Sequence, residues 1–187
     1  MESIEIRAAS VEDAERLLEI YAYYVENTAI SFEHEVPAIE EFRQRISRTL
    51  GRYPYLCVLQ DGVIQGYAYA GVFIARAAYQ WAAEMTIYLD KSAVKRGYGR
   101  LLYEKMESIL REMGILNLYA CIGYPVVEDE YLTENSARFH EHMGYAKIGE
   151  FHACGYKFGR WYDMIYMEKV IGEHGSPQRS IVAFPDL

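Results

Sequence analysis

Ala82-Ala83-Glu84-Met85-Thr86-Ile87-Tyr88-Leu89, followed by Val94-Lys95-Arg96-Gly97-Tyr98-Gly99-Arg100, is the stretch that decides the expected fold. Apolar and polar side chains alternate through residues 82–89, which predicts a strand with two different faces. A helix is expected from about Tyr98, because apolar residues recur at helical spacing until Gly114. Between them, two glycines allow a tight turn whose N–H groups, at the start of a helix, bind phosphate well. Taken alone, one Gly-x-Gly is more often an ordinary turn with solvated basic residues.

Two stricter phosphate motifs do not fit this loop. A dinucleotide-binding fingerprint needs a further glycine where Leu102 stands, and a P-loop needs Gly-Lys followed by Ser or Thr. Lys95, Arg96 and Arg100 nevertheless place positive charge at the turn, in a chain that is otherwise acidic. The loop is therefore a candidate site for a phosphorylated cofactor.

Strands and helices alternate irregularly on both sides of this stretch, which predicts a mixed α/β fold with no internal repeat. The expected strands are 4–7, 55–59, 64–73, 82–89, 118–122, 145–158 and 164–169. The expected helices are 11–26 after a capping box at Ser10–Asp13, then 37–50, 98–113 and 134–143. One domain is predicted over residues 1–170. Residues 171–187 are expected to be a loosely ordered tail, or to dock on the body or on a partner subunit through Ile181, Val182 and Phe184.

Composition excludes several classes of function. A net charge of −8 argues against a nucleic-acid surface, and no apolar run approaches the length of about 20 residues that crosses a bilayer. The N-terminus begins with acidic residues instead of a leader, so a soluble, cytoplasmic protein is expected. The 18 tyrosines predict an interior or pocket rich in rings with polar tips.

No metal site is predicted. The three cysteines lack a CxxC pair, and Cys57 and Cys121 are interpreted as small buried apolar residues because they stand in apolar runs. His140 and His142 are two positions apart, on different faces of the expected helix, so they do not form a histidine pair for a metal.

A series of short motifs runs along the chain from about Ile4 to Lys169. They are Ile6-Arg7-Ala8, Ser31-Phe32-Glu33, Arg76-Ala77-Ala78-Tyr79, Ala83-Glu84-Met85-Thr86-Ile87-Tyr88, Arg96-Gly97-Tyr98-Gly99, Phe139-His140-Glu141 with Gly144-Tyr145, and Gly155-Tyr156-Lys157-Phe158-Gly159-Arg160-Trp161-Tyr162-Asp163. Each is weak alone, but the set in this order is specific. Through it the chain resembles the GNAT acetyltransferase superfamily and, within it, the phosphinothricin acetyltransferase-like branch.

Two departures from the family pattern concern the cofactor. The pyrophosphate loop usually begins with Arg or Gln followed by Gly, where this chain has Val94 and Lys95. Backbone N–H groups do most of the phosphate binding, so binding is expected to survive, with Lys95 or Arg96 supplying charge. The late helix often has an Asn where this chain has Thr133, and an Asn stands instead at position 135.

The resemblance implies a twisted mixed sheet whose two central strands splay apart, with helices on both faces. Acetyl-CoA would lie in that cleft, its pantetheine arm along the edge of residues 85–89 and its pyrophosphate on the loop. The implied cofactor-binding residues are Ile87, Tyr88, Leu89, Lys95, Arg96, Gly97, Tyr98, Gly99, Arg100, Asn135 and Ser136.

Glu84 and His140 are the candidate catalytic residues. Glu84 would accept the proton of the attacking amine, directly or through a water, with a pKa raised by burial. The alternative is a glutamate that points to solvent from a half-buried strand. His140 would take the amine proton or supply one to the departing thiolate, and the alternative is a histidine on the helix surface.

The acceptor pocket is expected to include Phe32, Tyr79, Tyr88 and Tyr156, with Arg76 or Lys157 meeting a substrate carboxylate. Core packing is the alternative for each aromatic residue. Substrates in the branch are amino acids or analogues with a phosphinyl, sulfone or sulfoximine group.

The function that follows is direct transfer of acetyl from acetyl-CoA, in a ternary complex, to the primary amine of such a small molecule. A protein or peptide acceptor is an alternative, which the acidic surface would suit. A non-catalytic acyl-CoA sensor is a second alternative, against which the presence of both Glu84 and His140 speaks. The family also implies a homodimer.

Overall fold

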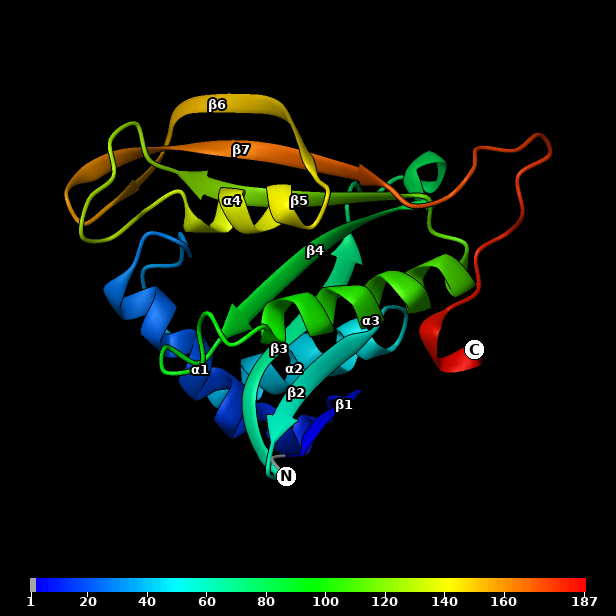
Figure 1. The fold of residues 1–187 in the computed structure, drawn as a ribbon, viewed down its shortest axis with the longest axis horizontal. Coiled ribbons are helices and arrows are strands. Elements are labelled where there is room, and N and C mark those ends of the chain that lie inside the picture. The colour runs from blue at the N-terminus through cyan, green and yellow to red at the C-terminus, as the bar shows by residue number, and fades with distance from the viewer. Residues whose placement is uncertain (1–2) are drawn as a thin grey trace.

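One mixed sheet of seven strands runs through the structure, a computed structural model that describes residues 3–187 (Figure 1). The strands are β1 (Ile4–Ala8), β2 (Tyr55–Gln60), β3 (Val63–Val72), β4 (Ala82–Leu89), β5 (Asn117–Tyr124), β6 (Ala146–Lys157) and β7 (Arg160–Val170). They lie in the order β1-β2-β3-β4-β5-β7-β6, and only β4 and β5 run parallel. The predicted mixed α/β sheet is thus confirmed.

Helices cover both faces of the sheet, as predicted. The helices α1 (Ala14–Asn27) and α2 (Ile39–Leu50) pack with β2 and β3 around one apolar core, and α3 (Tyr98–Met113) fills a second core on the opposite face, which α4 (Asn135–His142) borders. In Figure 1, α3 crosses in front of β2 and β3 while α2 lies behind them. No described helix combines the length and the apolar character that a membrane crossing requires.

Several element boundaries differ from the prediction by one or more residues, and two of the differences have a clear backbone cause. Helix α2 begins at Ile39 and not at Pro37, because Ala38 keeps an extended backbone with ψ of 149°. Strand β7 begins at Arg160 and not at Met164, because Phe158 and Gly159 have φ of 52° and 74°. Two successive residues of positive φ make a tight hairpin, so the pairing with β6 extends to its end.

The central strands β4 and β5 diverge, as the resemblance implied. They pair only at their first three residues, where Ala82, Ala83 and Glu84 face residues 117–119. Each strand keeps its other neighbour beyond this point, because β4 pairs with β3 up to Leu89 and β5 pairs with β7 up to Tyr124. The cleft opens where the mutual pairing ends, and Figure 1 shows the two strands moving apart.

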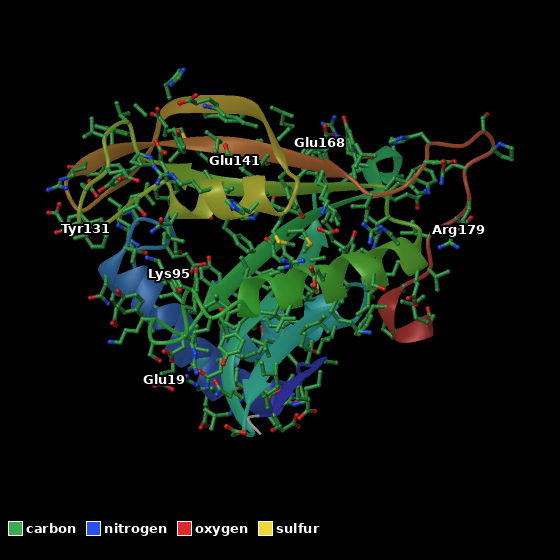
Figure 2. The ribbon with its side chains drawn as sticks, viewed as in Figure 1. Glu19, Lys95, Tyr131, Glu141, Glu168 and Arg179 are labelled. Atoms are coloured by element: carbon green, nitrogen blue, oxygen red, sulfur yellow. The ribbon has the colours of Figure 1, made fainter. Side chains whose placement is uncertain are left out.

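The residues after β7 run back along the body of the protein. Ile181 and Phe184 pack against the core beneath α3, and the Val182 N–H donates to the Met113 carbonyl over 2.9 Å. Arg179 donates to a carbonyl at the C-terminal end of α3, where a cation is favoured by the helix dipole (Figure 2). The contacts of these residues are therefore to the chain itself, while the division into a domain and a tail stays a prediction.

Candidate active site

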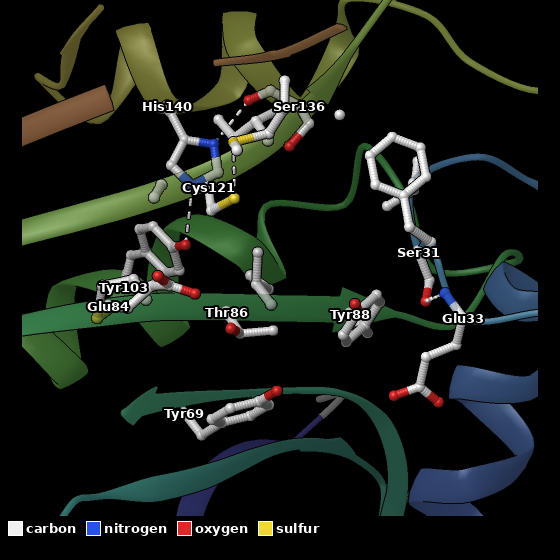
Figure 3. A pocket seen from close by; sticks show the side chains of 18 residues that line it. Ser31, Glu33, Tyr69, Glu84, Thr86, Tyr88, Tyr103, Cys121, Ser136 and His140 are labelled. Carbon is white, nitrogen blue, oxygen red and sulfur yellow. Dashed lines mark hydrogen bonds between the residues drawn. The ribbon is translucent and has the colours of Figure 1, made fainter. Parts of the chain in front are cut away.

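A cavity of about 410 Å³ opens in the cleft between β4 and β5 (Figure 3). Its walls come from β3, β4, β5, β7, the loop after α1, and the helices α3 and α4. Six of the residues predicted for the site line it, namely Phe32, Glu84, Ile87, Tyr88, Ser136 and His140. The structure thus brings both candidate catalytic residues to one space.

Glu84 is a half-buried carboxylate on this cavity. It stands in the middle of β4 on the face that also carries Thr86 and Tyr88. Within residues 3–187 it makes no hydrogen bond or ion pair to a side chain, so burial alone acts on it and raises its pKa. An unpaired carboxylate in a cleft, with a raised pKa, is suited to accept a proton.

His140 is buried, with both ring nitrogens engaged. Its Nδ1 lies 2.7 Å from the Ser136 carbonyl, which only accepts, so Nδ1 carries the proton. Its Nε2 lies 2.9 Å from the Tyr103 hydroxyl and accepts from it. Burial lowers the pKa of His140 to about 4, so the ring is neutral at pH 7. The ring proton is thus held by a carbonyl and the Nε2 lone pair by the Tyr103 hydroxyl, so neither nitrogen of His140 is free in this geometry.

The two candidate catalytic residues approach the cleft from opposite faces of the sheet. Ala83 and Met85 point into the core that α3 fills, so Glu84 between them points toward the face covered by α1 and α2. His140 and Tyr103 belong to α4 and α3, on the other face. The gap between β4 and β5 therefore connects the face of the sheet that carries Glu84 with the face bordered by α3 and α4.

The loop before α3 has the backbone of an anion site. Lys95 has φ of 63° and Gly97 has φ of 85°, and Gly97 directly precedes the first turn of the helix. A side chain at Gly97 would strain this turn, which explains the glycine. Lys95 and Arg96 are exposed, whereas Arg100 pairs with a glutamate one turn along the helix. The loop therefore offers backbone N–H groups, the helix dipole and two basic side chains.

Other residues predicted around the cofactor have different surroundings. The Tyr98 side chain is buried in the core, so only its backbone borders the loop, and Gly99 is buried beside it. On α4, Ser136 lines the cavity, whereas Asn135 is exposed and its N–H meets the Thr133 hydroxyl over 3.4 Å.

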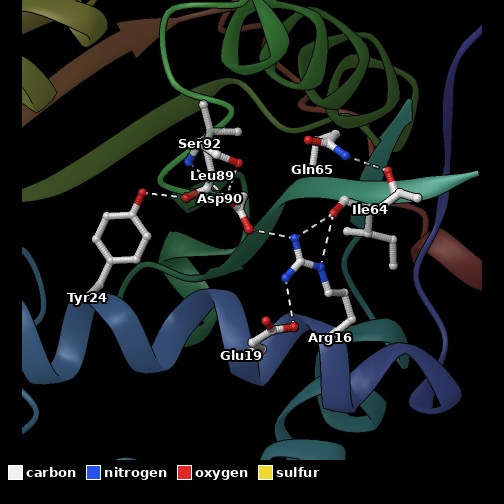
Figure 4. A network of polar contacts seen from close by, with 9 residues as sticks. Arg16, Glu19, Tyr24, Ile64, Gln65, Leu89, Asp90 and Ser92 are labelled. Atoms are coloured by element: carbon white, nitrogen blue, oxygen red, sulfur yellow. Dashed lines mark hydrogen bonds and ion pairs between the residues drawn. The ribbon is translucent and has the colours of Figure 1, made fainter. Parts of the chain in front are cut away.

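The end of β4 is fixed to α1 by a polar network (Figure 4). The Tyr24 hydroxyl donates to the Leu89 carbonyl over 2.5 Å. Arg16 donates to the Ile64 carbonyl over 3.2 Å and to the Asp90 carboxylate over 2.6 Å. Side chains of α1 therefore hold the end of β4 just before the glycine loop, and the Leu89 carbonyl already has one hydrogen-bond donor.

Four residues predicted for the acceptor pocket do not line the cleft cavity, namely Arg76, Tyr79, Tyr156 and Lys157. Tyr79 lines a separate cavity of about 380 Å³ at the opposite ends of β4 and β5. Arg76 lies exposed just before it, and Tyr156 is exposed on β6 against Trp161. The reason is topological, because the loop carrying Arg76 and Tyr79 leads into the start of β4 while the cleft opens toward its end.

Lys157 does not face the cavity. It is only 2% exposed, and its ammonium donates to the carbonyls of Thr28 and Ser31 over 2.9 Å and 2.6 Å. Burial lowers its pKa. The prediction that Lys157 meets a substrate carboxylate is replaced by a structural role, in which β6 holds the loop after α1.

Sequence reasoning missed several lining residues of the cavity, among them the polar side chains of Tyr103 and Cys121. Tyr103 lies on α3, and nothing in the sequence marks it as a partner of His140. Cys121, interpreted as buried, is exposed and lines the cavity, with its pKa raised by burial to about 11. Alternation along β5 carries the missed signal, because the buried Ala120 and Ile122 on either side must face the other way.

One group of possible metal ligands exists within residues 3–187. Single ligand atoms of Glu150, His152 and Asp163 lie within 4.8 Å of one another. The Lys147 ammonium pairs with Glu150, and the Ala153 N–H donates to Asp163 over 2.6 Å. An ion pair and hydrogen bonds therefore already occupy these carboxylates.

Known proteins resemble the chain in sequence and in fold. Residues 6–166 match the acetyltransferase (GNAT) domain family. A phosphinothricin N-acetyltransferase of Streptomyces viridochromogenes is 32% identical over 166 residues, covering 89% of this chain and 87% of the relative. An L-methionine sulfoximine/L-methionine sulfone acetyltransferase of Salmonella typhimurium is 28% identical over 173 residues, covering 92% and 97%.

A solved structure has the same architecture over nearly the whole length. It is that of a GNAT superfamily phosphinothricin acetyltransferase from Sinorhizobium meliloti in complex with AcCoA. The TM-score is 0.87 at 30% identity, covering 98% of this chain and 96% of that one. The chain therefore belongs to the GNAT acetyltransferase family.

Proposed function

We propose that the chain transfers acetyl from acetyl-CoA to the primary amine of a small molecule. The acceptor class is an amino acid or analogue such as phosphinothricin, methionine sulfone or methionine sulfoximine, which are substrates named for its relatives. The observation that carries the proposal is Glu84, an unpaired carboxylate with a raised pKa at the point where β4 and β5 separate.

The residues of the cleft fit acetyl-CoA. Beyond Glu84, the edge of β4 that faced β5 has no partner strand, and such an edge pairs with an extended amide chain. The loop at Gly97 suits a pyrophosphate, with Lys95 and Arg96 free to add charge. When bound, acetyl-CoA supplies a thioester carbonyl that a neutral amine attacks.

The residues proposed for proton transfer, Glu84 and His140, border the cleft from opposite faces of the sheet. An alkyl ammonium must lose a proton before it attacks, and Glu84, made more basic by burial, accepts it. Neutral His140 is held in one tautomer by the Ser136 carbonyl, and any proton that it takes or gives would pass through the Tyr103 hydroxyl at its Nε2. We expect direct transfer between the two bound substrates: the amine nitrogen forms the new C–N bond, the thioester C–S bond breaks, and CoA leaves as a thiol with a proton equivalent to the one that Glu84 accepted.

The test measures release of free CoA with a panel of amines and a basic peptide. Glu84→Gln keeps the size of the side chain but removes the base, so kcat is expected to fall about 10²–10⁴-fold while acetyl-CoA binding is retained. Glu141→Gln, at an exposed position on α4, is the matched control with unchanged kcat. Full activity of Glu84→Gln, or turnover of the peptide alone, would contradict the proposal.

Assembly and location stay predictions. The homodimer implied by the family resemblance is tested by sedimentation of the purified protein. The cytoplasmic location is tested by fractionation of the cells that make it.

A further inference from the structure

A second cavity of about 190 Å³ adjoins the cleft on the acceptor side. Helix α2 forms one of its walls, and the rest comes from tyrosines of α1, β2, β3 and β4 and from Glu33 in the loop after α1. It shares Glu33, Tyr69 and Tyr88 with the cleft cavity, so these three side chains stand between the two spaces. We call it the tyrosine chamber, after Tyr21, Tyr55, Tyr67, Tyr69 and Tyr88.

Most of the lining of the tyrosine chamber consists of aromatic rings. Tyr55 stacks on Tyr69 and on Tyr67 with centroids 4.8 Å and 5.5 Å apart, and Tyr21 meets Tyr88 edge to face at 5.0 Å. These are spacings at which aromatic rings attract one another, so a further ring is a favourable occupant. A cavity of about 150 Å³ accepts a benzene ring, so the volume suits a six-membered ring with a substituent.

The Tyr88 hydroxyl is one polar group of the chamber that a ligand can bond. It borders both the cleft cavity and the chamber, and within residues 3–187 it forms no hydrogen bond to another residue. It is not a buried unpaired group, because the Tyr145 hydroxyl is the only such side-chain atom in the described chain. A ligand in the chamber would therefore bond the Tyr88 hydroxyl in place of water.

The α2 wall carries one positive charge without a counter-ion. Arg45 is neutralised by Glu33 and Glu41, which it meets over 2.6 Å and 3.1 Å. Arg48 also lines the chamber, and in the part of the chain that the structure describes it forms no ion pair. An acidic group at this end of the chamber would therefore be attracted.

The distance from the reacting amine sets the length of the occupant. Thr86, which pairs with Tyr69, and Tyr88 follow Glu84 on the same face of β4. At a strand rise of about 3.3 Å per residue, the chamber lies about 7 to 13 Å from Glu84. A short side chain with its amine at Glu84 ends in the cleft, whereas an extended aromatic side chain reaches the chamber.

We propose that the tyrosine chamber is a side-chain compartment of the acceptor site, which takes amino acids with an extended aromatic side chain and prefers an acidic substituent on the ring. The inference rests on the proposed function, because it takes the acceptor amine to lie at Glu84. It extends the acceptor class beyond the small analogues named for the relatives.

The test compares three acceptors: methionine sulfone, which is short, 4-methoxyphenylalanine, and 4-carboxyphenylalanine. Thr49 lines the tyrosine chamber but not the cleft cavity, so Thr49→Trp fills only the chamber. It is expected to raise KM for both aromatic acceptors about tenfold, equal to 1.4 kcal/mol, and to leave methionine sulfone unchanged. Arg48→Gln is expected to remove the preference for the carboxyl over the methoxy substituent, with no effect on methionine sulfone.

The outcomes distinguish failure of the side-chain compartment from failure of the proposed acetyl transfer. Acetylation of methionine sulfone with no turnover of either aromatic acceptor overturns the inference and leaves the proposed function intact. An equal effect of Thr49→Trp on short and aromatic acceptors also overturns it. Thermal melting reports whether Thr49→Trp folds, and Thr49→Leu is the smaller filling variant if it does not. Absence of turnover with every amine overturns the proposed function instead.

Discussion

Replacing Lys157 by methionine removes a buried positive charge from beneath the loop that borders the cleft. The ammonium donates to the carbonyls of Thr28 and Ser31, and within residues 3–187 no carboxylate pairs with it. Methionine has nearly the same length and is apolar, so it fills the space without the hydrogen bonds. The change therefore isolates the bond between β6 and the loop after α1.

The expected loss of stability follows from these contacts. A hydrogen bond from a charged donor contributes about 1.5–3 kcal/mol, so the two together contribute about 3–6 kcal/mol. Burial lowers the pKa of Lys157, which shows that desolvation offsets part of this gain. We expect a net loss of about 3 kcal/mol, and a fall in Tm of about 6–12 °C for a chain of this size.

Lys157→Met is also expected to raise the KM for the acceptor without changing the KM for acetyl-CoA. Ser31, Phe32 and Glu33 line the cavity, so a released loop should raise KM for the acceptor about tenfold, with KM for acetyl-CoA nearly unchanged. Lys147→Met, at a surface ion pair, is the control, with a change in stability of about 0–1 kcal/mol. Denaturant unfolding and steady-state kinetics measure both quantities. An unchanged Tm together with an unchanged acceptor KM would refute the reasoning.

Three further changes test other contacts. In Gly155→Ala, the new Cβ would lie 2.6 Å from the Phe32 ring, so overpacking should cost about 1–3 kcal/mol and raise the acceptor KM; an unaltered melting curve and KM would count against it. His140→Phe should remove a pH dependence of stability, because a folded pKa of about 4 against 6.5 unfolded makes the native protein lose about 3 kcal/mol as the pH falls from 6.5 to 4. Equal slopes of unfolding free energy against pH in both proteins would contradict this. Lys169→Met should cost about 3 kcal/mol in denaturant unfolding, because it leaves the buried Glu107 without the ammonium that now lies 2.7 Å away; a loss below 1 kcal/mol would show that the pair contributes little.

Short sequence patterns predict the face of β4 that carries Glu84 and the position of the loop before α3. Alternation along β4 places Glu84 on one face of the strand and Ala83 and Met85 on the other. The glycine turn, followed by apolar residues at helical spacing, locates the start of α3. These features depend on neighbours a few residues away, which the sequence contains directly.

Contacts between distant segments were beyond such patterns. Lys157 reaches carbonyls more than a hundred residues earlier, and Tyr103 meets His140 from another helix. The prediction that Tyr79 lines the acceptor pocket fails for the same reason, because β4 and β5 separate at the opposite end of both strands. Which end of a strand opens depends on strand register, and no short motif encodes it.

The early divergence of β4 and β5 also makes the sheet two half-sheets, β1 to β4 and β5 to β7, joined by three residue pairs. Side chains supply the rest of the joint, because the apolar core around α3 contains residues of β3 and β4 and also of β5 and β7. A molecule that binds both strand edges bridges the two halves on the side where the backbone pairing is missing. Its binding stabilises the folded chain by about 2.7 kcal/mol at one hundred times its Kd.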